Sequence, residues 1–161
     1  MKTIERKLRL YLDTSVISYL FADEVPDKLN ETQTLWKDII ARKYEVYISD
    51  TTLREIMNCP EPKRTQMITE LGKIDYIHLE TNDEVNYLTN EYIKNGVLSS
   101  NSIDDCSHIA FAVSVRCDAI VSWNFKHLVN FRTNNKVRIV NSIINYQEIS
   151  IVSPTMVNGG E

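Results

Sequence analysis

Apolar residues in this chain recur with two different periods, one typical of strands and the other of helices. Short runs that alternate at period two, or are apolar throughout, predict strands. Longer segments with apolar residues three and four positions apart predict helices. The predicted strands are 9–12, 45–49, 74–79 and 119–122, and the predicted helices are 14–21, 30–43, 50–57, 63–73, 83–95 and 103–116.

Strands that alternate with helices are typical of an α/β domain. The pattern predicts a three-layer α/β/α sandwich around a central, mainly parallel sheet of four to five strands. Residues 136–140 alternate at period two and are predicted as a further strand, while 147–152 remains ambiguous. We expect a single domain over residues 1–150 and a C-terminal tail over 151–161.

Composition places the chain among ordinary globular proteins. It has 161 residues, of which 43% are hydrophobic and 25% charged, enough to bury a substantial core. No run approaches the roughly 20 apolar residues that cross a bilayer, and the first seven residues lack the apolar centre of a signal peptide. We therefore expect a cytoplasmic protein with no membrane contact.

Several classes of site are excluded by residue counts. The three cysteines include no C-x-x-C pair, which argues against a disulfide framework or a thiolate zinc site. The four glycines, at 72, 96, 159 and 160, form neither a G-x-G-x-x-G motif nor a P-loop. The net charge of −4 gives no general attraction for a polyanion, so a nucleic-acid site would need local positive charge or bound metal.

Acidic and amide side chains follow several predicted strands. Asp13 ends the first strand, Glu55 is placed in the first turn of the helix after the second strand, and Asp105 lies in the first turn of helix 103–116. Asn124 lies two residues past the run that ends at Ser122. In a parallel sheet the carboxyl ends of the strands meet at one edge, where ligands bind. Asp118 precedes its strand and is assigned to the opposite edge.

Helix capping is the alternative explanation for each acid taken singly. Asp13 is positioned to cap the helix that follows it. Thr52 to Glu55 and Ser102 to Asp105 both fit a capping box. Capping does not, however, require three acids to recur at one end of one sheet.

Three carboxylates at one place need a counterion. Without one they repel, and at least one is driven to protonate. Oxygen ligands with no His or Cys at metal spacing suit Mg²⁺ or Mn²⁺ rather than zinc. Such a site lowers the pKa of a bound water and orients it on a phosphodiester; whether one or two ions bind stays open.

Four ordered segments resemble the motifs of PIN domains, in particular the small single-domain proteins that include the VapC toxins of toxin–antitoxin pairs. The resemblance spans about residues 8 to 145. It implies a Mg²⁺- or Mn²⁺-dependent ribonuclease, usually a homodimer, often inhibited by an antitoxin protein. By position, Asp13, Glu55 and Asp105 would be metal ligands, directly or through water, and Thr14 or Ser15 would hold a water or ligand. The four segments are Leu12-Asp13-Thr14-Ser15, Leu53-Arg54-Glu55-Ile56, Asp105 to Ala112, and Ser122-Trp123-Asn124-Phe125-Lys126-His127-Leu128.

The chain departs from the family pattern at two positions. Asn124 stands where many members have an aspartate, so a second metal should bind more weakly and activity could be reduced. The Asp104-Asp105 doublet leaves the register open by one residue, and Asp105 is preferred because it precedes His108 by three, as in the family's D-x-x-H pattern. His108 itself is interpreted as a packed or hydrogen-bonded core residue rather than a base.

RNA phosphodiester hydrolysis that releases a 5′-phosphate and a 3′-hydroxyl is the leading hypothesis, in which Lys126 and His127 contact the RNA phosphates. Arg132, Lys136 and Arg138 extend this basic area, which a solvated face explains equally well. The alternative is a catalytically weak or inactive PIN domain that binds RNA or protein. An aspartyl-phosphate phosphotransferase is disfavoured, because position 15, where a second acid is needed, is Ser.

Overall fold

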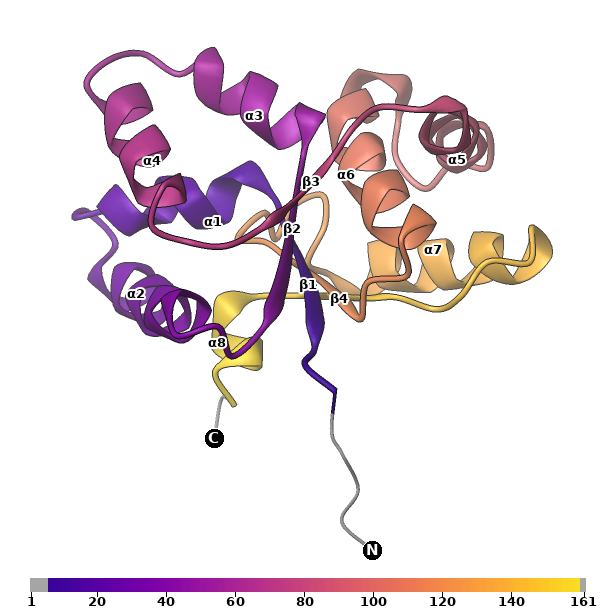
Figure 1. The fold of residues 1–161 in the computed structure, drawn as a ribbon. Coiled ribbons are helices and arrows are strands. Elements are labelled where there is room, and N and C mark those ends of the chain that lie inside the picture. Colours follow the sequence, from indigo (N-terminus) through magenta and orange to yellow (C-terminus); the bar gives the residue numbers. More distant parts are fainter. Residues whose placement is uncertain (1–5, 160–161) are drawn as a thin grey trace, which may run out of the picture.

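A computed structural model, which describes residues 6–159, contains one sheet flanked by helices on both faces (Figure 1). Within those residues the sheet has five strands in the order β3-β2-β1-β4-β5, and every neighbouring pair is parallel. The predicted three-layer α/β/α sandwich is therefore confirmed. Among the described residues, no helix is both long and apolar enough to cross a bilayer.

The order of elements follows the predicted alternation closely. Two short 3-10 turns, Tyr19–Phe21 and Ser100–Ser102, extend α1 and precede α6. The strands are β1 (Arg9–Leu12), β2 (Glu45–Ser49), β3 (Ile77–Leu79), β4 (Ala119–Val121) and β5 (Ser150–Val152). The helices are α1 (Thr14–Ser18), α2 (Pro26–Ile40), α3 (Asp50–Met57), α4 (Lys63–Leu71), α5 (Asp83–Lys94), α6 (Ile103–Ser114), α7 (Phe131–Ile143) and α8 (Pro154–Val157).

Strand β1 is the centre of the sheet. It pairs with β2 on one side and with β4 on the other, and its last two residues, Tyr11 and Leu12, are fully buried. Leu12 is in register with Val121, so the residues just past these two strands, Asp13 and Ser122, emerge next to each other. Parallel pairing thus brings both chain exits to the same edge of the sheet.

Each face of the sheet has its own apolar core. On one face α5, α6 and α7 pack against the sheet, with Phe111 of α6 and Tyr11 of β1 among the buried residues. On the other face α1 to α4 cover it, with Ile17, Leu35 and Ile48 buried. Helix α6 is buried along most of its length, because its apolar residues occur nearly all round, as the sequence predicts for a central helix.

The predicted strand at 136–140 is wrong, because this segment lies within helix α7. Its local sequence alternates at period two, but the buried positions Thr133, Val137, Val140 and Asn141 follow helical spacing over the longer segment. Asn130 caps the start of the helix, since its side-chain oxygen accepts a hydrogen bond from the Thr133 amide at 2.8 Å.

The fold continues past residue 150, where the sequence analysis places the start of a tail. Strand β5 pairs with β4 at the edge of the sheet, and α8 packs against α2. The Asn158 side chain donates to the Glu31 carbonyl of α2 at 2.9 Å. Residues 160 and 161 of the predicted tail lie outside the described residues.

Asp118 lies at the opposite edge of the sheet, as predicted, and fastens the start of β1. Its carboxylate accepts hydrogen bonds from the Arg6 guanidinium at 2.6 and 2.7 Å and from the Arg9 amide at 2.8 Å. The Arg6 hydrogen bond, helped by the Arg9 amide, holds the pKa of Asp118 below its usual value.

Replacement of Asp118 by Asn is expected to lower the free energy of unfolding by about 1 kcal/mol at pH 7. A depressed carboxyl pKa stabilises the fold above the unfolded pKa near 4, and this stabilisation is lost as the pH falls through the folded pKa. Urea titrations of both proteins should therefore show a gap at pH 7 that shrinks by about pH 3. A gap of the same size at both pH values would contradict this.

Candidate active site

Asp13 is held rigidly at the end of β1. Its two carboxylate oxygens accept hydrogen bonds from the hydroxyls of Ser15 and Ser122, both at 2.5 Å. Ser15 Oγ also accepts from the Trp123 amide at 2.8 Å, which ties the exit of β1 to the exit of β4. Asp13 occupies the N-cap position of α1, but its side chain does not cap the helix. Capping is therefore not the main role of this side chain, because serine hydroxyls hold both of its oxygens.

Burial sets the electrostatics of Asp13. The residue is 4% exposed, and loss of water around the carboxylate raises its pKa, although the charge of His108 and the two serine hydroxyls oppose the shift. A carboxylate at such a place favours a nearby positive charge.

Glu55 reaches the same edge of the sheet from α3. Helix α3 begins at Asp50, so Glu55 lies in its second turn, not in the first as predicted. One carboxylate oxygen, Oε1, accepts hydrogen bonds from Thr14 Oγ1 at 3.0 Å and His108 Nε2 at 2.6 Å. Glu55 therefore caps no helix end, and Oε2 has no hydrogen-bond partner among the described residues.

His108 of α6 lies behind the acids and connects them to the core. Its Nε2 donates to Glu55, and its Nδ1 is hydrogen-bonded to the Tyr11 hydroxyl at 2.6 Å. The Tyr11 hydroxyl is in turn 2.6 Å from Ser49 Oγ. The interpretation of His108 as a hydrogen-bonded core residue agrees with this arrangement, since the residue is 2% exposed.

The pKa values of His108 and Glu55 are shifted in opposite directions. Burial by itself lowers the pKa of His108, but the Glu55 hydrogen bond and the charges of Asp13, Glu55 and Asp105 outweigh it and raise the pKa. Burial by itself raises the pKa of Glu55, and here the His108 hydrogen bond and charge, with Thr14, outweigh it and lower the pKa. Three carboxylates thus stabilise a positive charge at a fully buried position.

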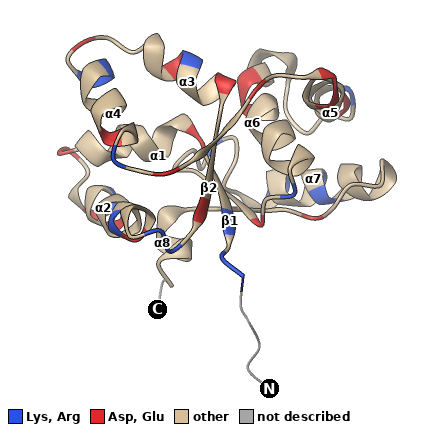
Figure 2. Cartoon of the chain, viewed as in Figure 1, with Lys and Arg blue, Asp and Glu red and all other residues tan. Residues whose placement is uncertain are grey.

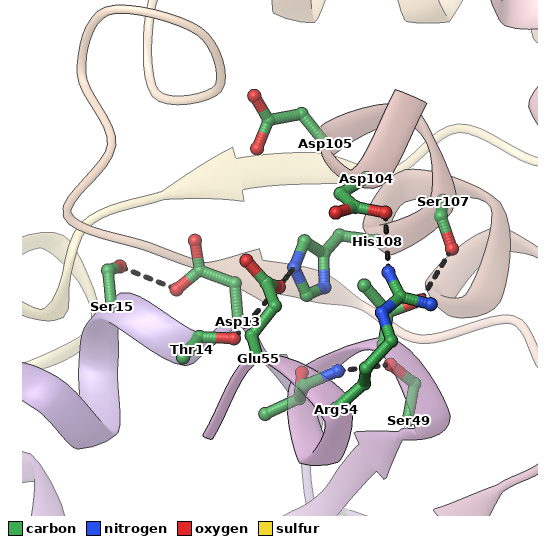
Figure 3. Close-up of polar contacts among 12 residues, drawn as sticks. Asp13, Thr14, Ser15, Ser49, Arg54, Glu55, Asp104, Asp105, Ser107 and His108 are labelled. Atoms are coloured by element: carbon green, nitrogen blue, oxygen red, sulfur yellow. Dashed lines mark hydrogen bonds and ion pairs between the residues drawn. The ribbon is translucent and has the colours of Figure 1, made fainter. Parts of the chain in front are cut away.

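The two acids of the doublet in α6 face different partners (Figure 3). Asp105 Oδ2 is 2.9 Å from His127 Nδ1, and the Asp105 side chain is 22% exposed. Asp104 pairs with Arg54 of α3 at 2.5 Å, and both side chains are about half exposed. Figure 3 shows Asp13 and Glu55 next to the His108 ring and Asp105 set apart from them at the start of α6.

Asn124 organises the turn that follows β4. Its side-chain oxygen accepts a hydrogen bond from the His127 amide at 3.0 Å, and its own amide donates to Ser122 Oγ at 2.9 Å. Its carbonyl accepts from the Leu128 amide at 2.9 Å. The side-chain oxygen of Asn124 therefore holds the loop that positions His127 beside Asp105.

The donor set fits a hard divalent cation by its chemistry. Asp13 and Glu55 provide carboxylate oxygens on neighbouring elements, with the hydroxyls of Thr14 and Ser15 beside them. By position the set is less compact, because within residues 6–159 no three His, Cys, Asp or Glu side chains are close enough together to hold a metal ion. Asp13 and Glu55 are the two acids that lie nearest to each other here, and Asp105 is set apart from them.

Sequence reasoning missed the residues that orient the acids. Ser122, Tyr11 and Ser49 were not selected, although Ser122 directly follows β4 just as Asp13 directly follows β1. A small polar residue directly after the neighbouring strand was the feature of the sequence that indicated a role for Ser122. For Tyr11, which contacts His108, and Ser49, which contacts the Tyr11 hydroxyl, the sequence contains no such indication.

Two solved structures share the fold of this chain. VapBC2 from Rickettsia felis, in a structure bound to a DNA fragment from the promoter, matches at a TM-score of 0.55 and 12% identity, covering 91% of this chain and 98% of that chain. VapC20 from Mycobacterium tuberculosis, described as a toxin that cleaves the sarcin-ricin loop, matches at 0.55 and 12%, covering 87% and 98%.

No family model and no curated protein matches the sequence. The structural matches carry the assignment: the chain has the fold of a VapC-like PIN domain.

Proposed function

We propose that this protein is a divalent-metal-dependent endoribonuclease of the VapC type. The observation that carries the proposal is the position of Asp13 and Glu55 next to the buried His108 at the carboxyl edge of the sheet, with Asp105 farther off at the start of α6 but near enough for its charge to raise the pKa of His108. Because three acids at one edge favour positive charge, Mg²⁺ or Mn²⁺ is the proposed cofactor. The proposed reaction is hydrolysis of RNA phosphodiester bonds.

The chain's own residues supply binding and orientation. When bound, a divalent cation lowers the pKa of a water and orients it on a phosphodiester. Ser15 and Ser122 fix the plane of the Asp13 carboxylate, while Thr14 and His108 hold Oε1 of Glu55 and leave Oε2 without a hydrogen-bond partner among the described residues. Such hydrogen bonds to metal ligands keep the ligands in place before the ion arrives.

The first test separates the two acids of the doublet. Purified protein should cut single-stranded RNA in Mn²⁺ and stop when EDTA is added. Asp105→Asn is expected to reduce the rate by about tenfold or more, whereas Asp104→Asn should change it less than about twofold, because Asp104 pairs with Arg54 at the surface. Cleavage that continues in EDTA would overturn the metal mechanism, and the reverse order of the two variants would overturn the register.

An inactive binding module is the second candidate, favoured by the use of Asn124 Oδ1 within its own turn. Calorimetric titration with Mn²⁺ decides between the two. A nuclease should give a binding heat that disappears in both Asp13→Asn and Glu55→Gln. An inert module should give no heat that depends on these side chains.

We also propose an antitoxin partner and a homodimeric state. The antitoxin follows from VapBC2, whose name denotes a toxin–antitoxin pair. The homodimer rests on the family resemblance. Co-expression with the product of an adjacent small gene, followed by native mass spectrometry, tests both, since a 1:1 or 2:2 complex and the free dimer have distinct masses.

A further inference from the structure

A cleft of about 1070 Å³ lies beside the acidic site, between the end of α5, the loop before α6 and the start of α7. It shares one wall with the acidic site, because His127 lines the cleft and its Nδ1 is hydrogen-bonded to Asp105. The cleft is therefore adjacent to Asp105, with His127 between the two.

The charge of the cleft is opposite to that of the chain. Its lining includes Lys126, Arg132 and Lys136 and no acidic residue, in a protein of net charge −4. Figure 2 shows basic residues on α7, the helix whose first turns line the cleft. Lys136 Nζ is committed to the Gly96 carbonyl at 2.9 Å, but Lys126 and Arg132 make no side-chain hydrogen bond or ion pair within residues 6–159. Two cations are thus available to an anionic ligand.

Two phenylalanine rings lie on the same walls. Phe131, the first residue of α7, is 84% exposed, and Phe125 is 44% exposed. Phe125 is fixed from behind, because its ring packs edge-on against Trp123 at 5.9 Å and Lys28 Nζ lies 5.0 Å from its centre. Large aromatic rings held at the surface beside unpaired cations are the combination that binds unpaired nucleotides, with rings on base faces and cations on phosphates.

We propose that this cleft binds the single-stranded segment of RNA on one side of the cleaved bond, an inference that rests on the proposed ribonuclease function. Arg132 and Lys126 contact phosphates, and Phe131 and Phe125 stack on bases. Base faces are accessible to the rings only when the strand is unpaired, because a duplex covers them. The cleft therefore selects single-stranded RNA and sets the direction in which the strand leaves the acids.

Binding is measured apart from cleavage, in EDTA at low salt, by fluorescence anisotropy of a fluorescein-labelled oligouridine. Phe131→Ala is expected to weaken binding about fivefold or more through lost stacking. Arg132→Gln is expected to reduce the slope of log affinity against log salt by about 0.7, the value for one phosphate contact on a single strand. Both residues are exposed, so neither change should disturb the fold.

Matched controls come from the far part of the same helix. Ile143→Ala removes an apolar side chain that is 71% exposed, and Arg138→Gln removes a cation; neither residue lines the cleft, so both variants should bind like wild type. A blunt RNA duplex of equal length should bind more weakly than the single strand and be insensitive to Phe131→Ala.

Each outcome bears on one proposal. The cleft proposal is overturned if wild type does not bind the oligouridine, if the cleft variants bind like their controls, or if the duplex binds as tightly as the single strand. If wild type cleaves RNA in Mn²⁺ and the cleft variants still bind oligouridine like wild type, the cleft proposal is overturned and the nuclease proposal stands. If the cleft binds oligouridine but wild type cleaves no RNA in Mn²⁺ or Mg²⁺, the nuclease proposal is overturned instead.

Discussion

An Asp13→Asn variant is expected to lose RNA cleavage by at least about 100-fold and yet to unfold at the same temperature as wild type or a higher one. The loss of cleavage follows because an amide gives the site one neutral oxygen in place of a negatively charged pair. The gain in stability follows because burial raises the pKa of Asp13, so keeping this carboxylate ionised costs free energy at pH 7.

The pH dependence of stability tests whether the ionised Asp13 carboxylate destabilises the fold. A carboxyl group whose folded pKa is raised destabilises the fold above that pKa, so the advantage of the Asn variant should be present at pH 7 and vanish below about pH 4. Scanning calorimetry in EDTA should show a midpoint about 2–4 °C higher at pH 7 if the cost is about 1 kcal/mol. Asp75→Asn, at an exposed position paired with Arg42, is the control that should change neither property.

A markedly lower midpoint would assign Asp13 a structural role instead. In that case the hydrogen bonds from Ser15 and Ser122 to the charged carboxylate stabilise the fold. The loss of cleavage would then result from unfolding.

A His108→Ala variant is expected to lose about 3 kcal/mol of unfolding free energy and to melt roughly 6–12 °C lower. The ring is fully buried, and both its nitrogens are hydrogen-bonded, to Glu55 and to Tyr11. Its removal leaves a cavity and takes a partner from each of these groups. His78→Ala removes a histidine that is 41% exposed and paired with Asp50, and should cost less than about 1 kcal/mol.

The difference between wild type and His108→Ala should itself depend on pH when metal is absent. A raised histidine pKa contributes stability that is complete below about pH 6.5 and is lost as the pH rises through the folded pKa. A lowered Glu55 pKa contributes stability above about pH 4.5 that is lost as the pH falls through its folded pKa. Urea titrations in EDTA should therefore show the largest gap between these two values, and a flat gap from pH 4 to 9 would argue against the ion pair.

Much of the sheet was predictable because its strands are short apolar runs that local sequence identifies. β1 and β2 were predicted at their observed bounds, and the alternation with helices indicated parallel pairing. The segment at 136–140 was not, because its five residues fit a strand while the helix around them is visible only over a longer window. β5 is a strand largely through its pairing with β4, which no local pattern reveals.

The sequence by itself indicated that acidic residues near the ends of three elements lie toward one edge of a parallel sheet. It could do so because chain order fixes whether a residue precedes or follows a strand. It also placed Asp118 at the opposite edge. Only the tertiary structure showed which partner each acid of the doublet has, since a helix turns successive side chains by about 100° and the partners, Arg54 and His127, come from distant parts of the chain. Hydrogen bonds between residues as far apart as Tyr11 and His108 depend on packing, which local sequence does not contain.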